Sequence, residues 1–213
     1  MASNRKQETF MTIQLYHCKG ARSMRPLWTL EEMGLEYDLH SLKFPPRVHQ
    51  REYIEVNPLG TVPYFIDGES RMTESPGICH YLVTKYGPTP LGVDPAEPDF
   101  ASFMNWLYYS DATMVFPMTL VFRYTELEPP ERRNPQVVDD YRRWFYGRLK
   151  AVELATADRE FLCADRFTIA DICVGYGLHF AERLGLAEGF RDNTRAYWER
   201  LKAIPSYQRV REM

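Results

Sequence analysis

The sequence is poor in cysteine, and its four cysteines lie far apart along 213 residues. None belongs to a Cys-x-x-Cys pair or to a histidine-rich cluster, which argues against a disulfide framework and against a cysteine-based metal site. Two of them, Cys79 and Cys173, fall within apolar helical patterns, as buried thiols do. We therefore expect a reduced, cytoplasmic protein without a bound metal.

The chain also lacks long apolar runs and a strong excess of charge. No stretch approaches the roughly 20 apolar residues that a membrane-spanning helix needs. The net charge of −3 gives no electrostatic attraction to nucleic acid or to an anionic membrane, so we expect neither as a partner. Residues 1–10 are polar and lack the apolar core of a signal peptide, and we expect them to form a frayed extension.

Residues 12–86 alternate between strand patterns and helix patterns. Strands are predicted at 12–17, at 35–42, and at 62–66 and 71–73, where Asp67-Gly68 turns a hairpin. Helices are predicted at 24–33, at 50–55 and at 75–86. The order is βαβαββα, a small mixed sheet covered by helices, which is the order of a thioredoxin-like domain.

Turn-forming residues separate this unit from a helical one. Residues 88–98 are rich in proline and glycine and are predicted to be a linker. Beyond them every pattern is helical, at 100–124, at 136–155, from 168 onward and at 191–203. Thr168 and Asp171 predict a capping box at the start of the third helix. The chain is thus predicted to be α/β over residues 1–87 and all-α over residues 99–213.

The clearest functional signal lies at Val62-Pro63 and Glu74-Ser75. A proline that opens a strand cannot donate to the sheet, so Pro63 belongs at an edge or in a cis bond. In the cis form the backbone N–H and C=O of Val62 point outward and can pair with a bound peptide. Ser75 opens a helix whose free N–H groups favour a carboxylate, and Glu74 favours an ammonium group. Glutathione offers a peptide backbone, a carboxylate and an ammonium.

Four segments together give the sequence a family resemblance. They are Arg22 to Glu32 after the first strand, Asn57 to Pro63, Thr73 to Ser75, and Phe167 to Asp171. In this order and spacing, with an all-helical second half, they resemble the cytosolic glutathione S-transferases, and most closely the bacterial members of serine or cysteine type. The resemblance extends over residues 12–210.

The resemblance implies a homodimer that binds glutathione against the first domain and a small apolar electrophile against the second. The implied activity is a detoxifying one, conjugation of the glutathione thiolate to the electrophile. By the same resemblance Val62 binds the cysteinyl backbone of glutathione, Pro63 is cis, and Glu74 and Ser75 hold the γ-glutamyl end. The capping box is implied to be structural.

The group that ionises the thiol departs from the family pattern. A thiol titrates near 8.5, and lowering its pKa by about two units requires roughly 2.7 kcal/mol of anion stabilisation. The family places a serine or a cysteine just before the position of Ser23, where this chain has Gly20, Ala21 and Arg22. We predict Ser23 as the activating hydroxyl, with Arg22 as its helper or replacement. The alternatives are a plain capping role for Ser23 and activation by a residue of the first strand's end: Tyr16, His17 or Cys18.

The glycine carboxylate of glutathione needs a basic or hydrogen-bonding partner after the second predicted strand. Lys43, Arg47, His49 and Gln50 are the candidates, and we predict His49. The charged residue Arg25 is interpreted as a structural ion-pair partner.

The helix predicted at 100–124 is expected to border the second-substrate pocket. Four of its residues are predicted to face that substrate: Tyr108, Asp111, Met114 and Val115. An aromatic stripe on the same helix is interpreted as core or dimer packing instead: Trp106, Tyr109 and Phe116.

Two other functions stay open. One is a glutathione-dependent isomerase of maleyl-type acids, or a lyase that cleaves aryl ethers. An isomerase of acids would need several arginines in its pocket, and the sequence offers only Arg22 and Arg123 as candidates. The other is a non-catalytic protein that keeps the fold and binds glutathione, because the familiar activating residue is missing.

Overall fold

A four-stranded mixed sheet forms the first domain of the computed structural model, which describes residues 13–213. The predicted frayed extension therefore lies outside the described residues. The sheet has the order β2-β1-β3-β4. Strand β1 (Ile13–His17) pairs in parallel with β2 (Tyr37–Ser41) and antiparallel with β3 (Tyr64–Asp67), which forms the predicted hairpin with β4 (Ser70–Met72).

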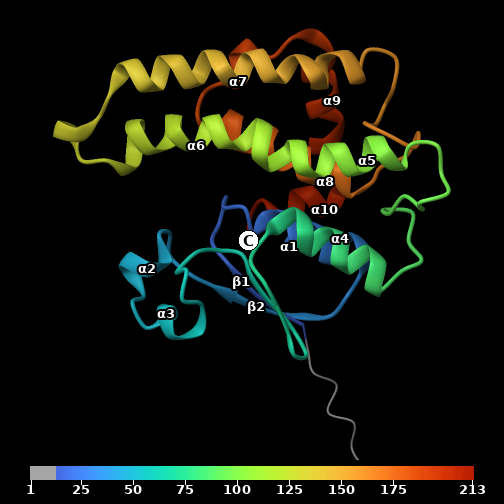
Figure 1. Ribbon diagram of the computed structural model, residues 1–213, viewed down its shortest axis with the longest axis horizontal. Coiled ribbons are helices and arrows are strands. Elements are labelled where there is room, and N and C mark those ends of the chain that lie inside the picture. The colour runs from blue at the N-terminus through green and yellow to red at the C-terminus, as the bar shows by residue number, and fades with distance from the viewer. Residues whose placement is uncertain (1–12) are drawn as a thin grey trace, which may run out of the picture.

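Helices α1 (Met24–Met33) and α4 (Ser75–Lys85) lie between this sheet and the second domain (Figure 1). Gly34 ends α1 in the left-handed conformation, at φ 61°, as its sequence position indicates. The helix predicted at 50–55 is instead two short ones, α2 (Pro46–His49) and α3 (Tyr53–Val56). The predicted thioredoxin-like order is otherwise confirmed.

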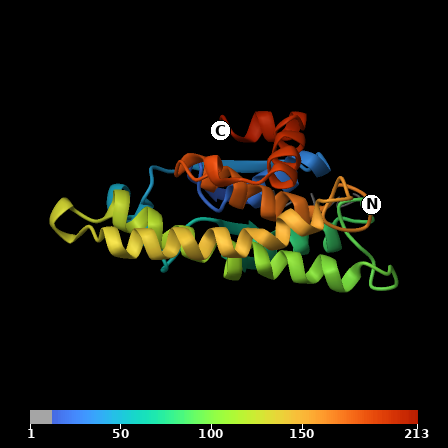
Figure 2. The same cartoon turned by 90° about the horizontal axis from the view of Figure 1, so that it is seen from above.

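The second domain is helical, and its longest helix, α7 (Pro135–Ala155), packs along α6 (Phe116–Phe122), as Figure 2 shows from above. The other long elements are α5 (Phe100–Tyr108), α8 (Ile169–Arg183) and α9 (Asp192–Lys202). Short 3₁₀ turns lie at η3 (Pro130–Arg132) and η4 (Ala187–Gly189). Pro205 ends the predicted last helix but also opens α10 (Pro205–Val210), because proline fits a first helical turn.

The helix predicted at 100–124 contains two π-helical segments, η1 (Tyr109–Val115) and η2 (Arg123–Leu127). Segment η1 ends just before Pro117. Proline has no N–H and its ring crowds the carbonyl four residues earlier, and a wider turn relieves both problems. Because a π-helical turn holds more residues than an α-helical turn, η1 rotates the face that the following residues present.

The predicted capping box at the start of α8 is confirmed. The backbone N–H of Thr168 donates to Asp171 Oδ2 at 2.9 Å, and the Thr168 hydroxyl oxygen accepts from the backbone N–H of Ala170 at 3.2 Å. The second oxygen of Asp171 accepts from the Tyr197 hydroxyl at 2.8 Å and from the backbone N–H of Leu162 at 3.0 Å. The box therefore also ties α8 to α9 and to the loop before α8.

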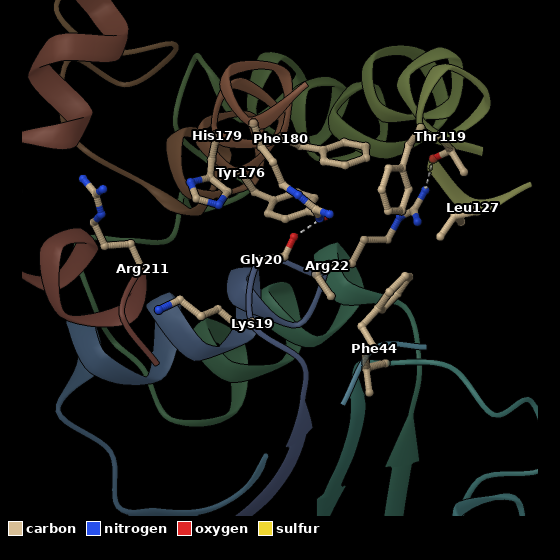
Figure 3. A pocket seen from close by; sticks show the side chains of 14 residues that line it. Lys19, Gly20, Arg22, Phe44, Thr119, Leu127, Tyr176, His179, Phe180 and Arg211 are labelled. Atoms are coloured by element: carbon tan, nitrogen blue, oxygen red, sulfur yellow. Dashed lines mark hydrogen bonds between the residues drawn. The ribbon is translucent and has the colours of Figure 1, made fainter. Parts of the chain in front are cut away.

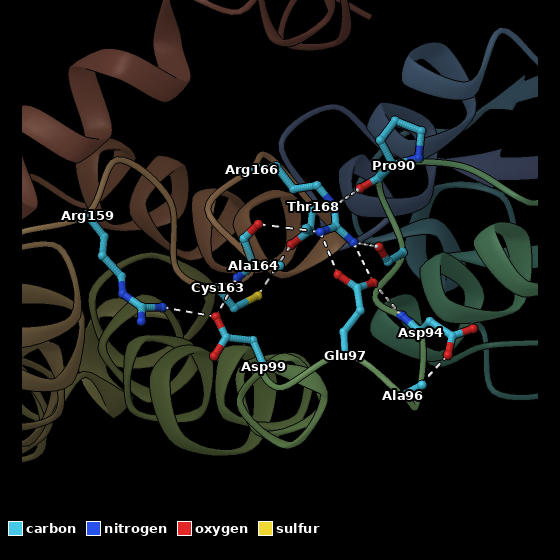
Figure 4. A network of polar contacts seen from close by, with 11 residues as sticks. Pro90, Asp94, Ala96, Glu97, Asp99, Arg159, Cys163, Ala164, Arg166 and Thr168 are labelled. Carbon is cyan, nitrogen blue, oxygen red and sulfur yellow. Dashed lines mark hydrogen bonds and ion pairs between the residues drawn. The ribbon is translucent and has the colours of Figure 1, made fainter.

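Arg166 fastens the segment predicted as a linker, residues 88–98, to the loop that leads into α8 (Figure 4). Its guanidinium donates to Pro90 O at 2.9 Å, to Gly92 O at 2.8 Å, and to both carboxylate oxygens of Glu97 at 2.7 and 2.8 Å. Asp99 accepts from the backbone N–H of Ala164 at 2.7 Å and from Arg159 Nη1 at 3.0 Å. The connection between the domains is thus held along much of its length.

The two domains share a core in which Trp28 of α1 is fully buried. Its ring packs against Phe167 and Tyr207 of the second domain, and its indole N–H donates to Ser206 Oγ at 2.8 Å. Such packing fixes one domain against the other. No helix within residues 13–213 is both long and apolar enough to cross a membrane.

Candidate functional site

A cavity of about 510 Å³ lies between the two domains (Figure 3). The loop after β1 and two other segments of the first domain form one wall: Lys19, Gly20, Ala21, Arg22, Phe44 and Val62. The opposite wall comes from α6, from Leu127 at the end of η2, from α8 and from Arg211, which follows the last helix. The cavity therefore exists only because the two domains are packed together.

The loop from Cys18 to Ser23 shapes the first wall. The backbone N–H of Ala21 donates to Cys18 O at 3.0 Å, and the N–H of Met24 donates to Ala21 O at 2.9 Å. Gly20 has φ +70°, and a Cβ atom there would lie 3.9 Å from both Arg183 Nη1 and His179 Nε2. A Cβ atom would therefore fit beside α8, and it is the left-handed backbone of the turn that favours glycine at this position.

Arg22 projects from this loop towards the second domain (Figure 3). Its Nε donates to Asp111 Oδ1 and its Nη2 donates to Thr119 Oγ1, both at 3.0 Å. Burial works to lower the pKa of Arg22, but the neighbouring Asp111 carboxylate outweighs it and raises that pKa. The guanidinium is therefore a fixed cation at the cavity, and its other N–H groups are available to a ligand.

Arg25 lies one turn further along and is completely buried. It donates to Asp111 Oδ1 and to Ser75 Oγ, both at 2.9 Å, and to the backbone oxygens of Cys173 and Ser110 at 3.1 and 3.0 Å. The prediction that Arg25 is a structural ion-pair partner is confirmed. Burial opposes ionisation of Asp111, yet the Arg25 and Arg22 guanidiniums hold its pKa below the usual range.

The predicted glutathione contacts fall in two places. Val62 lines the cavity, and the Val62-Pro63 bond is cis, as expected. Glu74 precedes α4, is exposed, and lines a second hollow of about 410 Å³ between α4 and α5, which Tyr108 and Asp111 also line. Because Asp111 binds Arg22, one ion pair joins the two hollows.

Comparison with known proteins agrees with this geometry. The family model of the glutathione S-transferase N-terminal domain matches residues 11–84. Glutathione S-transferase 1 of Triticum aestivum is 29% identical over 200 residues, covering 87% of each chain. Glutathione S-transferase GstB of Escherichia coli K12 is 26% identical over 189 residues, covering 86% of this chain and 89% of that protein.

Solved structures share the two-domain fold. A glutathione transferase from Methylococcus capsulatus superposes with a TM-score of 0.82 at 24% identity, covering 94% of this chain and 98% of that one. The transferase URE2P8 of Phanerochaete chrysosporium, solved with oxidised glutathione, gives 0.80 at 21% identity and covers 94% of each chain. Residues 11–84 thus match the glutathione S-transferase N-terminal domain, and the whole chain is similar to glutathione S-transferases.

Ser23 does not reach the cavity. Its side chain is 0% exposed, its hydroxyl hydrogen-bonds with His17 Nδ1 at 2.9 Å, and its oxygen accepts from the backbone N–H of Cys18 at 3.2 Å. It makes no side-chain capping bond to α1 either. The expectation that Ser23 meets the thiol is therefore corrected: its hydroxyl joins the end of β1 to the start of α1.

The other predicted activating groups do not line the cavity, apart from Arg22. His17 and Cys18 are buried, and burial lowers the pKa of His17 to about 4 and raises that of Cys18 to about 11. Tyr16 stacks on His40, with ring centroids 4.4 Å apart. Of the residues that the sequence singled out for this role, Arg22 is the one that lines the cavity.

Three further predicted contacts are not brought to the site. His49 is exposed at the end of α2 and lines neither hollow. Met114 and Val115 are fully buried, and Met114 occupies the space beside Gly177, where a Cβ atom would lie 2.7 Å from its Sδ. The prediction assumed α-helical spacing from Tyr108, and η1 turns these two residues into the core.

Other side chains line the cavity instead, and the sequence did not single them out. Thr119 and Phe122 supply the α6 side. Four residues of α8 supply most of the remainder: Tyr176, His179, Phe180 and Arg183. Their spacing of three, four and seven positions is that of one helix face, so helical periodicity counted from Thr168 would have grouped them. Within residues 13–213, no three side chains of His, Cys, Asp or Glu gather as metal ligands would.

Proposed function

We propose that the protein binds glutathione at the cavity between its domains, ionises the thiol and conjugates it to an electrophile. The observation that carries the proposal is Arg22, a cation with free N–H donors that lines the same cavity as Val62. Similarity to glutathione S-transferases supports the reaction, and related proteins were solved with oxidised glutathione, in URE2P8, and with glutathione, in Ure2p.

Glutathione lies along β3 and the start of α4 in this proposal. The backbone N–H and C=O of Val62 pair with its cysteinyl residue. The γ-glutamyl carboxylate meets the free backbone N–H groups of Ser75 and Gly77, since Pro76 has none and the N–H of Ile78 already donates to Glu74 O. The carboxylate of Glu74 pairs with the ammonium group.

Arg22 replaces Ser23 as the group that stabilises the thiolate. A charge-assisted hydrogen bond contributes roughly 1.5–3 kcal/mol, comparable with the roughly 2.7 kcal/mol that a shift of two pKa units requires. The released proton passes to solvent, and the thiolate sulfur attacks the electrophile. An apolar and aromatic surface for this electrophile is formed by Phe122 of α6 with Tyr176 and Phe180 of α8.

A homodimer is part of the proposal, by analogy with the family. The hollow between α4 and α5 exposes apolar surface, including Tyr108, whose side chain is 70% exposed. Replacing Tyr108 with glutamate would place a charge in such an interface. Sedimentation velocity should then give a smaller particle for the variant than for the wild type, and identical particles would argue against this face.

A glutathione-dependent isomerase is a second candidate, because the cavity has more cationic side chains than the sequence analysis counted: Lys19, Arg22, Arg183 and Arg211. The two reactions differ in their products. A transferase consumes glutathione stoichiometrically, whereas an isomerase returns it unchanged. Thiol titration during turnover of an unsaturated acid therefore separates them.

The deciding experiment is ultraviolet thiolate absorbance of the glutathione complex from pH 5 to 9. We compare the wild type with Arg22→Gln, and use Ser23→Ala as the matched variant. The wild type should show a thiol pKa well below 8.5, raised by about one to two units in Arg22→Gln and unmoved in Ser23→Ala. Bound glutathione that never ionises would favour the non-catalytic alternative, and absence of binding would refute the proposal.

A further inference from the structure

One end of the cavity between the domains is rich in cations. Lys19 and Arg211 lie there, on the opposite side of Gly20 from the direction in which Arg22 extends (Figure 3). Arg183 also lines the cavity, and its guanidinium lies over the Phe122 ring of α6. Among the described residues that line the cavity, none is acidic. This end is therefore distinct from the part that Arg22 and Val62 form.

Few carboxylates balance these cations. Arg183 Nη2 lies 3.4 Å from Glu126 Oε2, and both groups are about half exposed. Glu212 alone serves both Lys19, at 3.4 Å, and Arg211, at 3.2 Å, although its side chain is 69% exposed. Exposed pairs of this kind are weak and exchange readily with other partners. In the described ion pairs, these three cations share two carboxylate partners.

His179 adds no negative charge and is neutral near pH 7, because burial lowers its pKa to about 4. Its Nε2 and Arg183 Nη1 lie equally close to the position above Gly20. The Arg183 guanidinium lies 4.7 Å from the centre of the Phe122 ring, and Phe122 meets Phe180 edge to face. The cationic end therefore continues directly into an aromatic surface.

We propose that the electrophile is an anion, with a carboxylate or similar group on an aromatic or apolar body. Arg183 and Arg211 bind the anionic group while Phe122, Tyr176 and Phe180 contact the body. The inference rests on the proposed function and narrows it. It adds a charged group to the apolar electrophile that the resemblance implies. The sequence offered only Arg22 and Arg123 as pocket arginines when an isomerase of acids was considered. Arg123 instead pairs with Glu128 at 2.7 Å and does not line the cavity.

A matched pair of electrophiles tests the charge preference on the full-length protein with glutathione. The pair is 4-chloro-3,5-dinitrobenzoate and its neutral carboxamide. In both, the thiolate sulfur bonds to the ring carbon that carries chlorine, chloride leaves with the electron pair of the C–Cl bond, and the thiol proton enters solvent. After subtraction of the uncatalysed rates, kcat/KM should favour the benzoate by about tenfold or more.

Variants assign the preference to named side chains. Arg183→Gln and Arg211→Gln should each raise KM for the benzoate by about five- to tenfold and leave KM for the carboxamide within about twofold. Arg183→Lys should recover part of the loss because it keeps the charge. Arg143→Gln is the control, since Arg143 pairs with Asp139 on the exposed face of α7 and lines no part of this cavity.

Calorimetric titration with glutathione separates failure of this inference from failure of the proposed function. Unchanged glutathione affinity in Arg183→Gln, together with loss of the benzoate preference, supports the inference. Equal use of both electrophiles by the wild type overturns it while leaving conjugation intact. Weakened glutathione binding in Arg183→Gln also overturns it, because the cationic end would then hold glutathione itself. Absence of glutathione binding by the wild type overturns the proposed function and this inference with it.

Discussion

The Arg22 guanidinium and the Asp111 carboxylate form an ion pair across the two domains, with Nε 3.0 Å from Oδ1. The same carboxylate oxygen binds Arg25, which has no exposed surface, at 2.9 Å. One acidic side chain thus holds a structural arginine and orients the arginine proposed to meet the thiol. A substitution at Asp111 should therefore affect both the stability of the fold and the proposed activation of the thiol.

Asp111→Asn should lower the free energy of unfolding by about 3 kcal/mol, because it leaves Arg25 buried without its counter-ion. This loss of stability is at the lower end of the range for breaking a buried ion pair, since the Asp111 side chain is 31% exposed. Urea unfolding measures it. Asp139→Asn, which breaks an exposed pair on α7, should change stability by about 0.5 kcal/mol. Equal effects would contradict the special role of Asp111.

Glu74→Gln should raise the glutathione Kd by about tenfold, through loss of a charge-assisted contact with the ammonium group. Turnover at saturating glutathione should change less than twofold. Helix α4 should be unaffected, because the Glu74 side chain makes no capping bond. Calorimetry and steady-state rates test both statements, with Glu69→Gln in the exposed hairpin turn as the control. An unchanged Kd would place the γ-glutamyl end elsewhere.

Stability should fall as the pH drops from about 6.5 to about 4, because burial lowers the pKa of His17 to about 4. The unfolded chain, with an ordinary histidine pKa near 6.5, takes up its proton first, so acid favours unfolding. Each such histidine contributes at most about 1.4 kcal/mol for each pH unit in this window. His17→Gln should flatten the dependence of the unfolding free energy on pH, whatever its effect at pH 7. An unaltered slope would show that His17 titrates normally when folded.

Arg166→Met should loosen residues 88–98, since it removes donors to Pro90 O, Gly92 O and Glu97. Amide hydrogen exchange in this segment should become faster, whereas Arg143→Met should leave it unchanged. The Arg166 contact also lowers the pKa of Glu97 to about 2. The stabilisation from this ion pair is therefore complete above about pH 4.3, the pKa of a glutamate in the unfolded chain. It is lost as the pH falls towards 2. Unchanged exchange would mean that other contacts hold the linker.

The sequence predicted most of the fold because the decisive signals were local. Gly34 marks the end of α1, and Thr168 with Asp171 marks the start of α8. The π-helical turns of η1 were not predictable in the same way, because proline in a helix permits several accommodations, and tertiary packing selects among them. The misplacement of Met114 and Val115 follows directly from that choice.

The candidate site was only partly predictable, for a related physical reason. Val62, Pro63 and Glu74 belong to contiguous segments with recognisable backbone chemistry. Ser23 looked suitable by position, but a hydroxyl just before a helix can face inward or outward, and the Ser23 hydroxyl hydrogen-bonds with the buried His17. The cationic end was missed because Lys19, Arg183 and Arg211 come from three distant segments that only the packed domains bring together.

The fastened linker has a consequence for how this protein can change its substrates. With residues 88–98 held by Arg166, and Trp28 locked into the shared core, the two walls of the cavity keep a set separation. New specificity must then come from exchanging side chains that line the cavity, including those of α8, whose backbone is secured independently by its capping box. The scaffold thereby gives selection a small number of positions at which chemistry can vary while the fold stays constant.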